Sequence, residues 1–151
     1  GMNDMSDKKL NTAPVLEKLN RILELELAGV IRYTHYSFMV YGFGRIPIVS
    51  WLRSQADESM LHAHEAGELI TQLDGKPSLA VGPLLKRVTH DIADMLKDSL
   101  QHEENALQAY RDLLEVVAGK SIMLEEYSTR MISDETRHAG DVRKMLRAPG
   151  N

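Results

Sequence analysis

Five ionisable side chains fall on the apolar stripes that helical spacing would turn toward a protein core: Glu26, His62, Glu103, Glu135 and His138. Burying an unpaired carboxylate is costly, and these stripes carry too few Lys or Arg residues to neutralise three of them. Multivalent cations are the simplest counter-charges, and two cations suit this number of ligands better than one. The pattern therefore predicts a di-metal site with carboxylate oxygen and imidazole nitrogen ligands.

A sixth ligand is expected from the second helix. Glu135 and His138 are three residues apart, so their side chains share one helical face, about 5–6 Å apart at Cβ. His62 has no acidic residue three positions before it. Glu58, four positions before His62, is offset by only about 40° around the helix. We therefore favour Glu58 as the carboxylate that bridges the metals, with Glu65, three positions after His62, as the alternative.

Four long helices must position these side chains, because apolar residues recur at helical spacing and no stretch alternates like a strand. Thr12 should cap the first helix, with Pro14 in its first turn, and Ser121 should cap the fourth. Short turns at residues 42–44 and at Gly119 make each flanking pair of helices an antiparallel hairpin. The expected helices span residues 13–41, 46–73, about 84–118 and about 122–147.

The connection between the second and third helices, residues 76–83, contains two prolines and should be extended. Eight extended residues at roughly 3.3 Å each could cross about 26 Å, which permits a long crossover along the bundle. A simple up-down-up-down bundle is the alternative. We expect an all-α four-helix bundle over residues 13–148, with a long crossover between helices 2 and 3. A flexible N-terminus, residues 1–12, should precede it.

The candidate ligands lie at matching heights in such a bundle. Glu26 and His62 are about 16 and 18 residues on either side of the first turn, and Glu103 and Glu135 are each 16 residues from the second. Separate boundary residues would not be expected to coincide in this way. Tyr33, two turns after Glu26, could donate from its hydroxyl to a ligand carboxylate. The remaining histidines carry less weight as ligands: His35, His64, His90 and His102.

Composition narrows the class of protein. A chain of 151 residues suffices for one domain with a sizeable core. A formal charge of −4 gives no support for nucleic-acid binding, and no apolar run approaches the roughly 20 residues of a membrane span. The chain has no cysteine, which excludes disulfides, thiolate zinc sites and iron–sulfur clusters. We expect a cytoplasmic protein that binds neither nucleic acid nor membrane.

Several segments resemble bacterioferritin, a member of the ferritin-like di-iron superfamily. The fourth-helix segment Asp134-Glu135-Thr136-Arg137-His138 is similar to that family's ligand motif. The similarity extends over about residues 16–147 and includes residues 19–27, 62–63, 73–79 and 94–97. The resemblance implies a ferritin-like four-helix bundle with a ferroxidase centre, in which O₂ or H₂O₂ oxidises two Fe(II) ions. The iron would then be stored or released.

With Glu58 taken from the helix geometry in place of the family's own bridging residue, the resemblance implies that the expected metal ligands are also the catalytic residues: Glu26, Glu58, His62, Glu103, Glu135 and His138. Iron is the expected metal, and Mn or Zn would also suit these ligands. Met60 falls at the position of the family's haem-ligating methionine, at a two-fold interface between subunits.

Two departures from the family pattern bear on these expectations. Ser59 stands where the family's bridging glutamate belongs. The sequence continues for about 13 residues after His138, without the short fifth helix associated with a 24-subunit cage, so we expect a homodimer or a larger homo-oligomer. A rubrerythrin-like peroxidase or another di-metal oxidoreductase is an alternative function. A non-enzymatic helical interaction domain is a second alternative.

Overall fold

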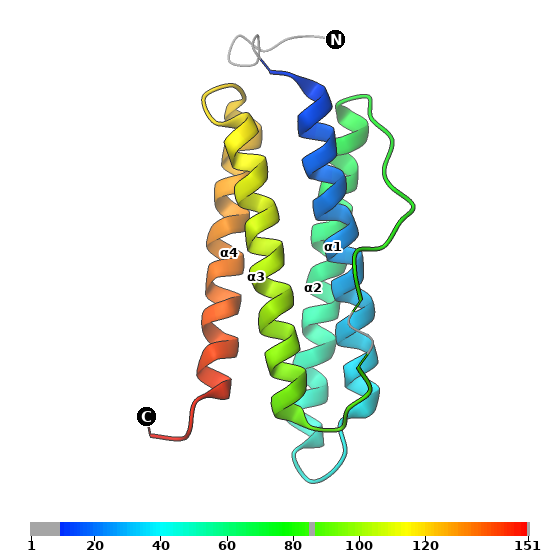
Figure 1. Cartoon of the computed structure of the whole chain (residues 1–151), viewed down its shortest axis with the longest axis vertical. Coiled ribbons are helices and arrows are strands. Elements are labelled where there is room, and N and C mark those ends of the chain that lie inside the picture. The colour runs from blue at the N-terminus through cyan, green and yellow to red at the C-terminus, as the bar shows by residue number, and fades with distance from the viewer. Residues whose placement is uncertain (1–9, 85–86, 151) are drawn as a thin grey trace.

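The computed structural model describes residues 10–84 and 87–150 and folds them into four helices (Figure 1). The helices are α1 (Thr12–Met39), α2 (Arg45–Gln72), α3 (Ile92–Val117) and α4 (Ile122–Leu146). The described residues contain no strand, which confirms the predicted all-α class. None of these helices combines the length and the hydropathy that crossing a membrane would need. The predicted flexible N-terminus falls mainly on residues 1–9, outside the described ranges.

The helices form two antiparallel hairpins. α1 packs against α2, α3 packs against α4, and α1 also packs against α3. Figure 1 shows that α2 and α3 run in the same direction, because the chain between them travels back along the length of the bundle. The predicted long crossover between helices 2 and 3 is therefore confirmed, and the up-down-up-down alternative is wrong.

The crossover is longer than the sequence indicated. Because α3 begins at Ile92, the connection covers residues 73–91 instead of residues 76–83. A helix of 28 residues is about 42 Å long at 1.5 Å per residue, which exceeds the roughly 26 Å that eight extended residues can cross. The crossover is fixed to α1 by a backbone hydrogen bond of 2.9 Å from the Gly82 N–H to the Glu24 carbonyl oxygen.

Local capping explains where α1 and α4 begin. Ser121 caps α4 as predicted, since its hydroxyl accepts a hydrogen bond of 3.2 Å from the Leu124 N–H. The prediction that Thr12 caps α1 is wrong, because Thr12 is already helical and the cap is Asn11. The Asn11 side-chain oxygen accepts from the Ala13 N–H at 3.3 Å. Asn is among the most favoured capping residues, ahead of Thr.

A polar layer divides the core of the bundle. Along α1 one apolar cluster ends at Leu25 and the next begins at Tyr33, and along α2 the corresponding gap lies between Ala56 and Ala63. The buried ionisable side chains in this interval include four of the predicted ligands: Glu26, His62, Glu103 and Glu135. The layer holds candidate metal ligands from all four helices and lies between two apolar clusters.

Candidate metal centre

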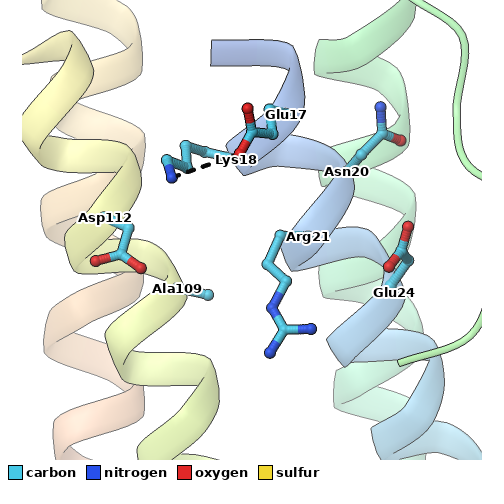
Figure 2. Close-up of a pocket in the computed structure, with 7 residues that line it drawn as sticks. All are labelled: Glu17, Lys18, Asn20, Arg21, Glu24, Ala109 and Asp112. Atoms are coloured by element: carbon cyan, nitrogen blue, oxygen red, sulfur yellow. Dashed lines mark ion pairs between the residues drawn. The ribbon is translucent and has the colours of Figure 1, made fainter. Parts of the chain in front are cut away.

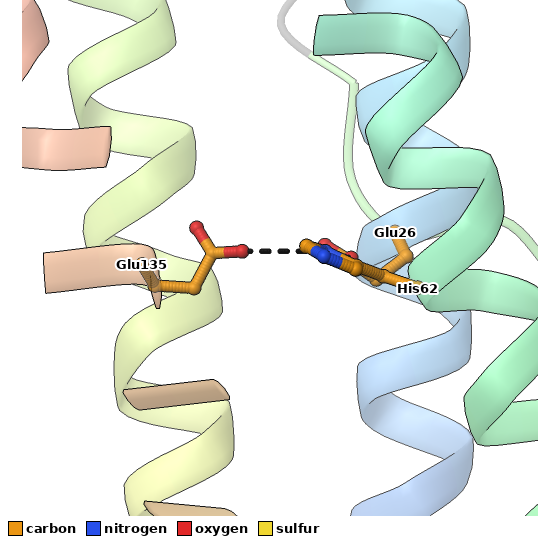
Figure 3. Close-up of side chains that lie close together, drawn as sticks. All are labelled: Glu26, His62 and Glu135. Atoms are coloured by element: carbon orange, nitrogen blue, oxygen red, sulfur yellow. Dashed lines mark ion pairs between the residues drawn. The ribbon is translucent and has the colours of Figure 1, made fainter. Parts of the chain in front are cut away.

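Three of the predicted ligands converge from α1, α2 and α4 (Figure 3). His62 Nδ1 lies 2.6 Å from Glu26 Oε2 and 3.5 Å from Glu135 Oε1. One ligand atom from each of the three residues lies within 4.8 Å of the others. Glu26 and Glu135 are only 2% and 1% exposed. This spacing suits a single metal ion held between the three side chains.

A second group of three ligands adjoins the first. Glu103 from α3 joins Glu135 and His138 from α4, again with one ligand atom of each residue within 4.8 Å of the others. His138 is half-buried, and its Nδ1 lies 3.7 Å from Glu135 Oε2. Glu135 thus belongs to both groups and turns one oxygen toward each histidine. Glu135 would therefore be the carboxylate shared by two metal ions if both groups were occupied.

The two candidates for the sixth ligand differ in their surroundings. Glu58 Oε1 lies 3.1 Å from His138 Nε2 and 3.8 Å from His62 Nε2, although Glu58 belongs to neither group of three. Glu65 Oε2 instead lies 2.6 Å from a guanidinium nitrogen of Arg130. The structure therefore brings Glu58 to the edge of the centre, where it is half-buried, and places Glu65 in an ion pair between α2 and α4.

Tyr33 holds one ligand in position. Its hydroxyl donates a hydrogen bond to Glu103 Oε1, as the sequence suggested that it could. Tyr33 is fully buried, and its ring packs edge-on against Trp51 with centroids 6.2 Å apart. The bond leaves the second oxygen of Glu103 available to a metal ion.

Burial and mutual contacts shift the pKa values of the predicted ligands. Burial raises the pKa of Glu26 to about 7, and it also raises the pKa of Glu103. Burial opposes the charged form of His62, but the carboxylates of Glu135 and Glu26 outweigh this effect and raise the His62 pKa to about 10. Burial likewise acts to raise the pKa of Glu135, but contacts with Glu103, His138 and His62 lower it. Metal binding at Glu26, Glu103 and His62 would therefore be coupled to the release of protons.

The residues present fit a pair of divalent metal ions. Glu26 Oε2 and Glu135 Oε2 are buried, and within the described residues neither has a partner in hydrogen-bond geometry, although Glu26 Oε2 lies close to His62. Leaving buried carboxylate oxygens unpaired is costly, and a cation would satisfy them. Carboxylates with imidazoles suit Fe, Mn and Zn, so these side chains would hold such metals.

A separate groove of about 450 Å³ lies between α1 and α3 (Figure 2). Its lining mixes acidic and basic side chains, and Lys18 Nζ lies 3.8 Å from Glu17 Oε1. None of the candidate metal ligands lines this groove. It is therefore distinct from the metal centre.

The fold and the centre together define a class of protein. Four helices with one long crossover, and a layer of carboxylates and histidines at mid-bundle, are the features of the ferritin-like carboxylate proteins. The model of the ferritin-like domain family matches residues 16–148. The chain therefore belongs to the ferritin-like domain family, which confirms the relationship inferred from the sequence.

Individual relatives agree with this assignment. The nutrient stress-induced DNA-binding protein of Nostoc sp. is 28% identical over 120 residues, and the match covers 79% of this chain but only 65% of that protein. Bacterioferritin of Brucella melitensis is 29% identical over 127 residues, which cover 80% of this chain and 72% of that protein. The crystal structure of a ferritin-like, diiron-carboxylate protein from Bacillus anthracis superposes with a TM-score of 0.81 at 28% identity, covering 88% of this chain and 95% of that chain.

One histidine outside the predicted ligand set is buried. His35, His64 and His90 are exposed, but His102 is buried, and burial lowers its pKa to about 4. Gly29 was a signal for this burial in the sequence. A glycine inside a helix lowers the stability of the helix by about 1 kcal/mol relative to alanine, so its presence indicates that another group packs closely against the backbone. His102 is the group that approaches Gly29.

Proposed function

We propose that this chain binds two iron ions and oxidises Fe(II) to Fe(III) with O₂ or H₂O₂, in iron storage or detoxification. The observation that carries the proposal is the pair of three-ligand groups that share Glu135. The similarity to bacterioferritin and to a diiron-carboxylate protein supports iron as the metal. Metal analysis of the protein purified without chelator tests this choice, and a lack of Fe, Mn and Zn would contradict it and favour an interaction domain.

The proposal gives each ligand a role. Glu26 and His62 would hold one ion, Glu103 and His138 would hold the other, and Glu135, which belongs to both groups, would serve both. Glu58 completes the set of six from the half-buried edge, where it contacts both histidines. Two bound Fe(II) ions would each supply one electron to the oxidant. The carboxylates favour the more highly charged Fe(III) product, and the flanking apolar clusters keep bulk water out.

Stopped-flow absorbance of Fe(II) oxidation tests the proposed ferroxidase activity. Glu103→Ala should slow oxidation strongly, because it removes a ligand of one group. Glu104→Ala is the matched control: Glu104 is the next residue along α3, but it points outward and pairs with Arg143 at 2.9 Å. Equal rates in wild type and Glu103→Ala would rule out the proposed centre.

Assembly and haem binding remain predictions. Large apolar side chains are exposed near the α1–α2 turn, which supports self-association into a homodimer or a larger homo-oligomer: Phe38, Tyr41, Phe43 and Ile46. Light scattering would measure the assembled mass. Met60 is half-buried on α2, and haem at this residue predicts a Soret band after haem supplementation. The cytoplasmic location and the absence of nucleic-acid binding are likewise predictions from the sequence.

A further inference from the structure

A small pocket lies between α1 and the crossover, which runs alongside this helix (Figure 1). The pocket has a volume of about 280 Å³, and its apolar lining comes from Ile31 on α1 and from Leu84 and Val88 on the crossover. None of the predicted metal ligands borders it. We call it the crossover pocket. Pockets that bind small molecules usually measure about 300–1,000 Å³, so this one suits a ligand at the small end of that range.

Arg32 brings an unpaired positive charge to the crossover pocket. It lines the pocket and is half-buried. Among the described residues its guanidinium forms no ion pair with an acidic side chain. Its Nε is buried and has no hydrogen-bond partner there, and its Nη2 donates a long hydrogen bond of 3.4 Å to the Pro83 carbonyl oxygen. A charge partly removed from water needs an opposite charge nearby, so Arg32 lacks a counter-ion.

The carboxylate beside the other polar lining residues is already occupied. Arg87, which lines the pocket, donates to both oxygens of Asp98, from Nη2 at 2.7 Å and from Nε at 3.1 Å. The hydroxyl of Tyr36, another lining residue, donates to Asp98 Oδ2 at 2.7 Å. Asp98 therefore neutralises Arg87 and leaves the charge of Arg32 uncompensated.

Two aromatic side chains also line the crossover pocket. His35 and Tyr36 lie one helical turn after Arg32, and their ring centroids are 5.8 Å apart with the rings tilted by 55°. Aromatic rings pack favourably against other flat rings, and a guanidinium stacks on them as well. A ligand with a flat apolar body would contact these groups, and it would also cover Val88, which is 76% exposed.

We propose that the crossover pocket binds a small aromatic carboxylate, whose negative charge pairs with Arg32 and whose ring lies among the apolar and aromatic side chains. A guanidinium and a carboxylate match in their planar geometry and form strong charge-assisted hydrogen bonds. Inorganic phosphate would pair with Arg32 but leave the apolar lining exposed to water. A neutral aromatic molecule would cover the lining but leave the charge unpaired. The inference goes beyond the proposed function, because the pocket needs no bound metal.

Benzoate is the probe that tests the ligand class. Saturation-transfer difference NMR of the metal-free full chain measures its dissociation constant, which should be millimolar or below for a ligand of this size. Benzyl alcohol has the ring without the charge, and acetate has the charge without the ring. Each should bind at least about tenfold more weakly, since each lacks one of the two contributions. Benzyl alcohol or inorganic phosphate binding as tightly as benzoate overturns the inference.

Substitution of Arg32 tests the proposed counter-charge. Arg32→Gln should weaken benzoate binding about 10- to 100-fold, the range for one lost hydrogen-bonded contact with a charged group. Arg32→Lys keeps the charge and should retain part of the affinity. Arg21→Gln is the matched control, because Arg21 lies on the same helix but is exposed and borders the groove between α1 and α3. Equal affinities in wild type and Arg32→Gln overturn the inference.

A substitution on the crossover side gives a second test. Val88 is exposed, so Val88→Asp should fold like wild type, and the carboxylate that it introduces would repel benzoate and compete with it for Arg32. Benzoate binding should fall at least about tenfold in this variant. An unchanged affinity would mean that benzoate binds elsewhere, which overturns the inference even if Arg32→Gln does not fold.

Crystals soaked with para-bromobenzoate locate the bound ligand. The bromine should give an anomalous peak between α1 and the crossover, with the carboxylate beside Arg32. A peak only elsewhere, or a crossover pocket filled by a second copy of the chain, overturns the inference and leaves the proposed function intact. Failure of the wild-type protein to bind Co(II) or Fe(II) overturns the proposed function alone, since benzoate binding is measured without metal.

Discussion

Replacing Glu135 by alanine should weaken both metal sites at once. Glu135 supplies one carboxylate oxygen on the side of each histidine, with Oε1 3.5 Å from His62 Nδ1 and Oε2 3.7 Å from His138 Nδ1. Both groups of three ligands include it. Glu26→Ala, in contrast, removes a ligand from one group only. The two variants therefore separate a shared ligand from an unshared one.

The expected size of the effect follows from the number of metal ions that each carboxylate serves. A hydrogen bond or similar interaction with a charged group contributes about 1.5–3 kcal/mol, and every 1.4 kcal/mol changes a dissociation constant about tenfold. Removing one ligand should therefore weaken the binding of one ion by about 10- to 100-fold. Glu26→Ala should show this weakening for one of two ions, and Glu135→Ala should show it for both.

Titration with Co(II), followed by absorbance and calorimetry, measures the two binding steps. Wild type should bind two ions per chain, Glu26→Ala one tightly and one weakly, and Glu135→Ala two weakly. Glu126→Ala serves as the control, because Glu126 lies on the same helix as Glu135 but is exposed and pairs with Arg130 at 3.4 Å. If Glu135→Ala weakens a single step, or behaves like Glu126→Ala, the shared-ligand geometry is refuted.

Three more predictions follow from the same structure. Co(II) affinity should rise from pH 6 to pH 8, because the pKa values of Glu26 and His62 are raised to about 7 and about 10, so that the metal must displace bound protons. The loss of these protons becomes easier as the pH rises. Calorimetry in buffers of different ionisation enthalpy counts the released protons, and an affinity that does not change with pH would contradict the prediction. Glu58→Ala should slow stopped-flow Fe(II) loading several-fold, and an unchanged rate would remove Glu58 from the ligand set. Asp98→Ala should lower the free energy of unfolding in urea by about 1–3 kcal/mol, because the buried hydroxyl of Tyr36 loses the Asp98 carboxylate to which it donates at 2.7 Å. Asp94 lies nearer the surface, so Asp94→Ala should change the free energy of unfolding little. An equal loss of stability in Asp94→Ala and Asp98→Ala would contradict this reasoning.

The helices were predictable because their signals are local. Glycine turns, a serine cap at Ser121 and apolar residues at helical spacing each act over a few residues. The cap of α1 was misplaced by one residue, since Asn11 and Thr12 are both capping residues and only the fold decides between them. The length of the crossover was underestimated because it depends on the length of the whole bundle, which no short segment encodes.

Some residues of the candidate site could likewise be predicted from the sequence, whereas other features depend on how the helices pack. Glu26, Glu103 and Glu135 stood out because a carboxylate on an apolar stripe is conspicuous in a sequence. The role of Glu135 as the shared ligand did not stand out, because it depends on how α2 and α4 face one another. The close approach of Ser59 and His102 to Gly29 was also hidden, since three helices must pack before both side chains reach the same glycine.

Diffraction at the iron absorption edge, from crystals of the protein loaded with Fe(II), tests the central claim most directly. The account predicts two anomalous peaks about 3.5–4 Å apart, one within Glu26, His62 and Glu135 and the other within Glu103, Glu135 and His138. Glu135 should contact both peaks. A single peak, or iron bound only outside these two groups, would contradict the account.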